Sequence, residues 1–165
     1  MGPAEELRFL ILAIQREGNR VFAADLRPLG LTPSQAEALR VLADYQPLTL
    51  SGLGELLVCE TGDSPSRLVD RLVKADLVRR EPDPVDRRNV TLTLTPAGRR
   101  LAKKVAAVEE RLHATIDRLV DGQPVDETLA LLRAFASAFP AGQAVARRAA
   151  AERASGPRAS GGDEG

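Results

Sequence analysis

The segment 77–96 limits the possible folds more than any other part of the chain. Residues 77–81 and 89–94 have the composition of β-strands, and the second segment alternates polar with apolar side chains. The residues between them include two prolines and four charged side chains, Asp83, Asp86, Arg87 and Arg88. This pattern predicts a β-hairpin with a basic tip. Because an isolated hairpin is only marginally stable in water, we expect it to pack against a larger body and to use its tip for contact.

The composition favours a helical core in a cytoplasmic protein. Apolar residues make up 44% of the 165 residues but aromatic residues only 3%, so leucine, valine and alanine must fill most of the core, a mixture that favours helices. The single cysteine excludes an intramolecular disulfide framework and fits a reducing compartment. The apolar run 9–14 is too short to cross a bilayer, and Glu5 and Glu6 precede it where a secretory signal carries basic residues. We therefore expect a cytoplasmic protein without membrane contact.

Four helices are expected before the hairpin. Apolar residues at helical spacing predict a long helix over residues 5–27. Thr32 and Gln35 then form the pattern of a capping box, which predicts a second helix. Residues 48–50 suit a short strand, and a third, short helix is expected from residue 49 or 51. Ser64 followed by Pro65 predicts the start of the fourth helix, because proline is favoured at the first helical position.

Two helices are expected after the hairpin. Thr95 and Pro96 begin the fifth, whose apolar residues form a near-heptad stripe as far as residue 119. The sixth begins near Asp126, kinks at Pro140 and frays in a run rich in alanine and arginine, and residues 155–165 have the composition of a disordered tail. The predicted fold is mainly α with a small β-hairpin wing: a winged helix-turn-helix domain with a helical dimerisation region.

The fourth helix and the hairpin tip carry the candidate DNA-binding residues. The first turn of the helix offers side chains and free N–H groups to a major groove or a phosphate. Arginine on a thin hairpin suits a DNA groove, because the guanidinium group is always charged and weakly hydrated. The predicted DNA-binding residues are Ser64, Ser66, Arg67, Arg71, Lys74, Asp86, Arg87 and Arg88. Asp70 is expected to pair with Arg71 or Lys74 along the helix.

The distribution of charge supports a polyanionic partner. The chain has a formal net charge of zero, with 23 basic and 23 acidic residues. Residues 64–104 contain eleven Lys and Arg against five Asp and Glu, a net charge of +6, so the remaining residues carry a net charge of −6. A basic middle segment within an acidic frame is typical of a protein that binds nucleic acid.

The segment 31–101 resembles the core of the MarR family of bacterial transcription regulators. The resemblance lies in a leucine-rich helix pair, the run 67–72 and a turn that reads Leu-Val-Arg-Arg over 77–80. It continues in an Asp-x-Arg-Arg wing, which here reads Asp-Pro-Val-Asp-Arg-Arg over 83–88, and in a Leu-Thr-Pro-Ala-Gly exit over 94–98. One departure is Asp76, where the family usually has glycine. Aspartate tolerates a left-handed backbone fairly well, so the turn is expected to be kept.

The resemblance implies a homodimeric regulator of transcription with no cofactor. It implies a repressor that binds a pseudo-palindromic operator in double-stranded DNA and is released by a small, possibly aromatic, effector, and it implies that Asp86 holds Arg88 for the minor groove. Long apolar stripes also favour dimerisation, because one small domain cannot cover them. The expected organisation is a dimerisation helix over 1–31, the winged domain over 32–94, dimerisation helices over 95–154 and the tail.

Other interpretations of single residues remain open. Cys59 fits a buried inert thiol, and the alternative is a redox-sensing regulator that acts through it. His113 fits a surface or interface histidine. One histidine and one cysteine cannot form a tetrahedral metal site without clustered carboxylates, and no catalytic combination is visible, so neither a metal site nor an enzyme is expected. The alternative function is a winged-helix module that binds another protein.

Overall fold

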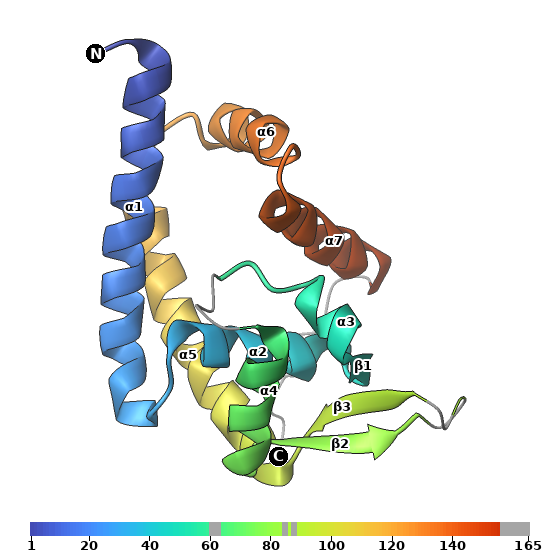
Figure 1. Cartoon of the computed structure of the whole chain (residues 1–165). Coiled ribbons are helices and arrows are strands. Elements are labelled where there is room, and N and C mark those ends of the chain that lie inside the picture. The colour runs from blue at the N-terminus through green and yellow to red at the C-terminus, as the bar shows by residue number, and fades with distance from the viewer. Residues whose placement is uncertain (60–63, 84–85, 87–88, 156–165) are drawn as a thin grey trace.

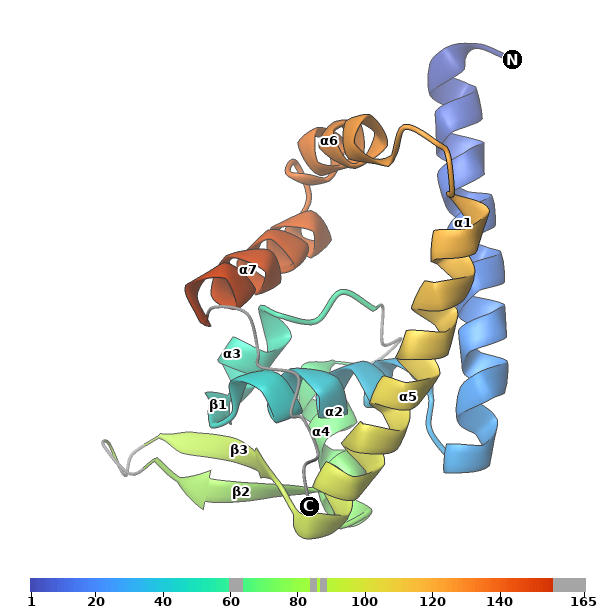
Figure 2. The same cartoon turned by 180° about the vertical axis from the view of Figure 1, so that it is seen from behind.

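The computed structural model describes residues 1–59, 64–83, 86 and 89–155, which form seven α-helices, one 3-10 helix and a three-stranded sheet (Figures 1 and 2). The elements in chain order are α1 (Pro3–Leu26), the 3-10 helix η1 (Arg27–Leu29), α2 (Pro33–Tyr45), β1 (Leu48–Thr49), α3 (Leu50–Gly54), α4 (Pro65–Lys74), β2 (Val78–Pro82), β3 (Val90–Leu94), α5 (Pro96–Leu119), α6 (Val125–Ala136) and α7 (Pro140–Ser155). None of the helices in this part of the chain combines the length and apolar character that crossing a lipid bilayer requires.

Three of the predicted helix starts, those of α2, α4 and α5, are confirmed by capping hydrogen bonds. The Gln35 backbone N–H donates to Thr32 Oγ1 at 3.3 Å, and the Thr32 N–H donates to Gln35 Oε1 at 2.9 Å, which completes the capping box of α2. The hydroxyls of Ser64 and Thr95 accept in the same way from the third residue of α4 and α5. These bonds satisfy N–H groups that have no partner inside the helix.

The predicted hairpin is present, with each strand beginning one residue later than expected. The strand order is β1–β3–β2, all neighbours are antiparallel, and Val78 pairs with Leu94. Both of these side chains are buried, so one face of the hairpin packs on the helices. Asp76, in the turn before β2, has a φ of 55°, which confirms the expected left-handed turn.

The core lies where the lower halves of α1 and α5 meet the winged domain (Figure 2). Its largest fully buried side chains come from α1, α2, α3, α4, the sheet and α5: Leu26, Leu39, Leu42, Leu53, Leu68, Val69, Leu72, Val78, Leu92, Leu94 and Val105. The apolar stripe of α5 has a buried N-terminal part and an exposed C-terminal part. Val105 and Val108 are buried, whereas Ile116 and Leu119 are 45% and 76% exposed.

The C-terminal part differs from the prediction of one kinked helix. It forms two helices, and the run rich in alanine and arginine does not fray but continues α7 to Ser155. The two helices approach closely at Gly142, in the first turn of α7, where an added Cβ would lie 2.0 Å from the carbonyl oxygen of Ala136 at the end of α6. α7 consequently folds back beside α2 and α3 (Figures 1 and 2).

Candidate nucleic-acid interface

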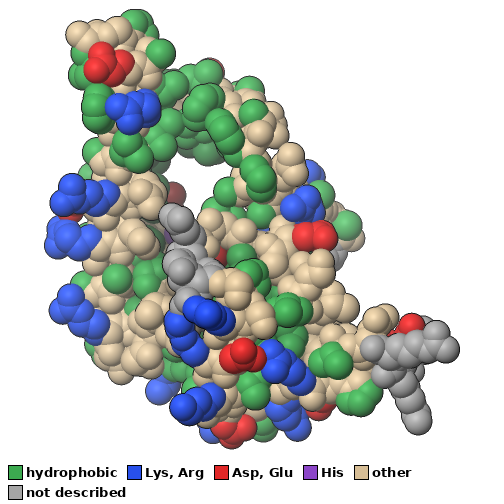
Figure 3. Space-filling view, viewed as in Figure 1, with side chains coloured by type: hydrophobic (Ala, Val, Ile, Leu, Met, Phe, Trp, Pro, Cys, Tyr) green, Lys and Arg blue, Asp and Glu red, His purple; other side chains and the backbone are tan. Residues whose placement is uncertain are grey.

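Helix α4 has one buried face and one basic face. Leu68, Val69 and Leu72 are at most 2% exposed and fix the helix against the core. Arg67, Arg71 and Lys74 are exposed, and their spacing of four and three residues puts them on the same side of the helix. Lys and Arg side chains gather over this region of the surface (Figure 3). The packing of α4 therefore presents three of the predicted basic residues to solvent together.

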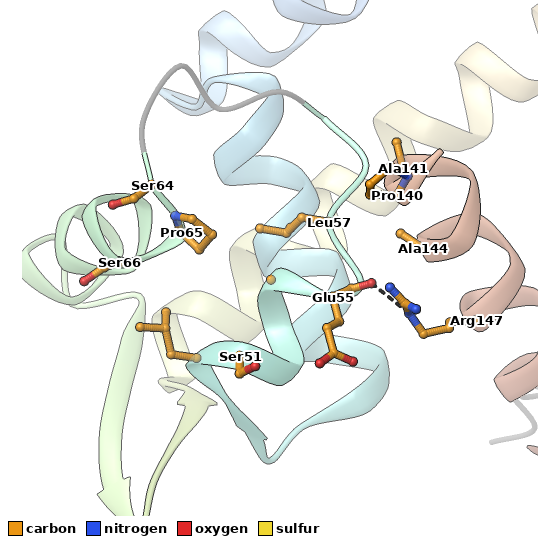
Figure 4. A pocket seen from close by; sticks show the side chains of 12 residues that line it. Ser51, Glu55, Leu57, Ser64, Pro65, Ser66, Pro140, Ala141, Ala144 and Arg147 are labelled. Carbon is orange, nitrogen blue, oxygen red and sulfur yellow. Dashed lines mark hydrogen bonds between the residues drawn. The ribbon is translucent and has the colours of Figure 1, made fainter. Parts of the chain in front are cut away.

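The two predicted serines lie at the N-terminus of α4. Ser64 is exposed and caps the helix, and its hydroxyl accepts from the Arg67 N–H at 3.4 Å. Ser66 is partly buried. Both serines line a groove between α3, α4 and α7 (Figure 4). The positive end of the helix dipole at this turn favours an anionic group such as a phosphate.

The structure describes both strands of the wing and, near its tip, Asp83, Asp86 and Asn89. Asp86 is exposed, its N–H donates to Asp83 Oδ1 at 3.0 Å, and its carbonyl accepts from the Asn89 N–H at 2.9 Å. Arg87 and Arg88 lie outside the described residues, so the expected pairing of Asp86 with Arg88 stays a prediction.

Two basic residues of the wing were not among the predicted contacts. Arg79 and Arg80 on β2 are exposed, and Arg80 Nη2 lies 2.6 Å from Asp70 Oδ1 on α4. The ion pair found for Asp70 thus reaches the wing, whereas a partner on its own helix was expected. Helical spacing alone could not reveal this pair, because the two residues belong to different elements.

Cys59 lies in the segment that leaves α3 toward α4. Its side chain is partly buried, and its backbone N–H donates to Glu37 Oε2 at 2.8 Å. Burial raises the pKa of the thiol to about 12, and the Glu37 carboxylate adds to the rise. A protonated thiol at neutral pH is a weak nucleophile, which agrees with an inert cysteine.

A hollow of about 910 Å³ lies between the C-terminal halves of α1 and α5 and the segment that contains Cys59. Its walls are largely apolar and include Ile14, Phe22, Leu112 and Ile116. His113 is exposed on α5 and is not one of the residues that line this hollow. No cluster of three or more His, Cys, Asp or Glu side chains suited to a metal ion occurs within the described ranges.

Comparison with known proteins identifies the family of the central domain. The MarR family model matches residues 31–90. The HTH-type transcriptional regulators YsmB and YcgE of Bacillus subtilis are 33% and 39% identical over 103 and 80 residues, which is 61% and 48% of this chain. The matched parts span 66% and 51% of those relatives, so the chain aligns with between half and two thirds of their length.

Solved structures show the same fold over a longer part of the chain. A mutant MarR from E. coli complexed with operator DNA is 27% identical, with a TM-score of 0.65 over 82% of this chain and 94% of that chain. The MepR–DNA complex from S. aureus has a TM-score of 0.72 over 80% of this chain and 97% of that chain, at 22% identity, and shares the fold. On these grounds residues 31–90 form a MarR-family domain, and the fold of the chain is that of solved MarR-family winged-helix structures.

Proposed function

We propose that this protein is a homodimeric transcription regulator that binds a pseudo-palindromic operator and acts as a repressor released by a small molecule. Such a protein would work in the cytoplasm, together with the DNA that it binds. The observation that carries the proposal is the basic face of α4 beside the wing. Arg67, Arg71 and Lys74 are exposed there, and their helix is held rigidly by its buried face.

In this proposal α4 enters the major groove and the wing reaches the adjacent minor groove. Ser64, Ser66 and the N-terminal turn of α4 contact phosphates, Arg67 and Arg71 reach base edges or phosphates, and Lys74 contacts the backbone. Arg87 and Arg88 at the wing tip supply the minor-groove contact. The E. coli MarR structure with operator DNA supports this assignment, because it shares the fold.

Exposed apolar side chains support the dimer. Three segments outside the winged domain carry them: Phe9, Leu10, Leu12 and Ile14 on α1, Ile116 and Leu119 at the end of α5, and Leu129, Leu131 and Phe135 on α6. All are more than a third exposed in the single chain, and large exposed apolar surfaces mark interfaces. A two-fold dimer would place the two α4 helices on half-sites about one helical turn apart, roughly 10 base pairs.

The apolar hollow beside Cys59 supports a small-molecule effector. It is bounded by α1 and α5, which belong to the proposed dimer region, and by Val58 and Cys59, which lead toward α4. A compound that binds there touches both the dimer region and the approach to the DNA-binding helix. Its largely apolar walls suit an amphipathic or aromatic molecule. Cys59 itself is proposed to be structural and not a redox switch.

Selection of genomic fragments by the purified protein tests the function. Sequencing of the bound DNA should reveal a pseudo-palindromic motif, and affinity for that motif should fall by orders of magnitude as salt rises. The alternative, a protein-binding module, predicts no enriched motif and little DNA binding at any salt concentration. Footprints over a single unsymmetrical half-site would contradict the dimeric part of the proposal.

A further inference from the structure

Helix α7 is built to return to the winged domain. Gly142 in the first turn of α7 lies so close to the end of α6 that an added Cβ would meet the carbonyl oxygen of Ala136 at 2.0 Å, and Ala144, two residues further on, is 2% exposed. Arg147 Nε then donates to the carbonyl oxygen of Glu55, just after α3, at 3.1 Å (Figure 4). This helix lies outside the segment that the family model matches, residues 31–90.

The central contact of α7 is an ion pair with a buried carboxylate. Arg148 Nη2 lies 2.5 Å from Glu37 Oε1 on α2, and Glu37 is only 8% exposed. The carbonyl of Arg148 also accepts from the Tyr45 hydroxyl at 3.5 Å. A buried carboxylate needs a cation and hydrogen bonds to offset its desolvation, so Arg148 offsets part of the cost of burying Glu37.

The same carboxylate holds the segment that leads to α4. Glu37 Oε1 accepts from the Val58 N–H at 2.9 Å, and Oε2 accepts from the Cys59 N–H at 2.8 Å. Hydrogen bonds to an ionised carboxylate are stronger than those between neutral groups. Glu37 on α2 therefore connects α7 to the segment between α3 and α4, which are the two helices of the helix-turn-helix.

We propose that Glu37 and Arg148 are positioning residues for DNA binding. In this proposal, Arg148 orients and neutralises the Glu37 carboxylate. The carboxylate in turn holds the backbone of Val58 and Cys59, and the position of this segment sets the orientation in which α4 enters the DNA groove. Neither residue touches DNA in this account. The inference rests on the proposed function, because it needs α4 to be the element that reads DNA.

The test compares Arg148→Met with Arg153→Met in the full-length protein. Both changes remove one charge from α7, but Arg153 is exposed. Affinity for the selected operator duplex is measured at two salt concentrations, together with urea unfolding and hydrogen exchange of the Val58 and Cys59 amides. We expect Arg148→Met to bind about tenfold more weakly with an unchanged salt slope, since no phosphate contact is lost, and to exchange both amides faster. Arg153→Met should behave as wild type, and Arg148→Lys should recover part of the affinity.

Three outcomes separate the possibilities. If Arg148→Met lowers the urea midpoint while the folded protein binds the operator as tightly as wild type, the pair is only structural and the proposal is overturned. If Arg148→Met does not fold, the double variant Glu37→Gln with Arg148→Met decides, because it leaves no uncompensated buried charge: weak binding supports positioning, and wild-type binding overturns it. If Arg71→Ala also binds like wild type, the proposed function itself fails.

Discussion

Asp70 on α4 and Arg80 on β2 form an ion pair, with Oδ1 and Nη2 2.6 Å apart. This contact joins the helix and the wing, the two elements that we propose to contact DNA. Both side chains of this pair are exposed, whereas the core contacts of α4 are made by its buried residues Leu68, Val69 and Leu72. The relative placement of α4 and the wing therefore depends on a surface pair as well as on core packing.

Loss of this pair should change stability little. The side chains of Asp70 and Arg80 are 56% and 42% exposed, and an exposed ion pair contributes at most about 1 kcal/mol. Asp70→Ala and Arg80→Ala are each expected to lower the free energy of unfolding in urea by less than about 1 kcal/mol. A loss several times larger would show that the pair supports the core and not only the surface.

Gly98 should tolerate no side chain. An added Cβ would lie 2.0 Å from the backbone carbonyl oxygen of Leu77, which no rotation of a side chain can relieve. Gly98→Ala should therefore lower the free energy of unfolding by about 2 kcal/mol or more. The matched control is Gly18→Ala on α1, where a Cβ meets nothing within 4 Å and alanine should leave stability equal or higher. If the two variants had equal free energies of unfolding in urea, the clash expected at Gly98 would be refuted.

The exposed face of α1 should be buried in the dimer. Leu10 is 53% exposed in the single chain, so a charge there costs little within one chain but much at an apolar interface. Leu10→Asp should sediment as a monomer at micromolar concentration with wild-type helical content, whereas Glu110→Ala, at an exposed position on α5, should remain a dimer. A dimeric Leu10→Asp protein would exclude this part of α1 from the interface.

Cys59 should react slowly and should matter for stability only at high pH. Its pKa is raised from 9.0 to about 12, so the folded protein keeps the thiol protonated where the unfolded chain loses the proton. This contribution to stability is fully present below pH 9 and is lost as the pH rises from 9 toward 12. Iodoacetamide at pH 8 should label the folded protein much more slowly than the urea-unfolded chain. Equal labelling rates would contradict the raised pKa of the folded thiol. Loss of DNA binding on peroxide treatment in wild type but not in Cys59→Ser would indicate a redox switch.

Most of the fold follows from local signals in the sequence, and the main exceptions depend on long-range contacts. The capping residues Thr32 and Ser64 mark helix starts because their hydrogen bonds close within three residues. The basic face of α4 was predictable from helical spacing. The pair of Glu37 with Arg148 was not, because 111 residues separate its members and Glu37 stands in sequence like any surface glutamate. The return of α7 depends on the same contact.

The most direct test of the central claim is equilibrium binding of wild type and Arg71→Ala to the selected operator duplex, at about 50 mM and about 200 mM salt. Arg71 is exposed on α4, so its loss should leave the fold intact, and Arg20→Ala on α1 serves as the control with the same charge change. We expect Arg71→Ala to lose about 1 to 3 kcal/mol of binding free energy and, if it contacts a phosphate, to show a shallower salt dependence, while Arg20→Ala binds as wild type. Wild-type affinity in Arg71→Ala, or no operator binding by the wild-type protein at either salt concentration, would contradict the account.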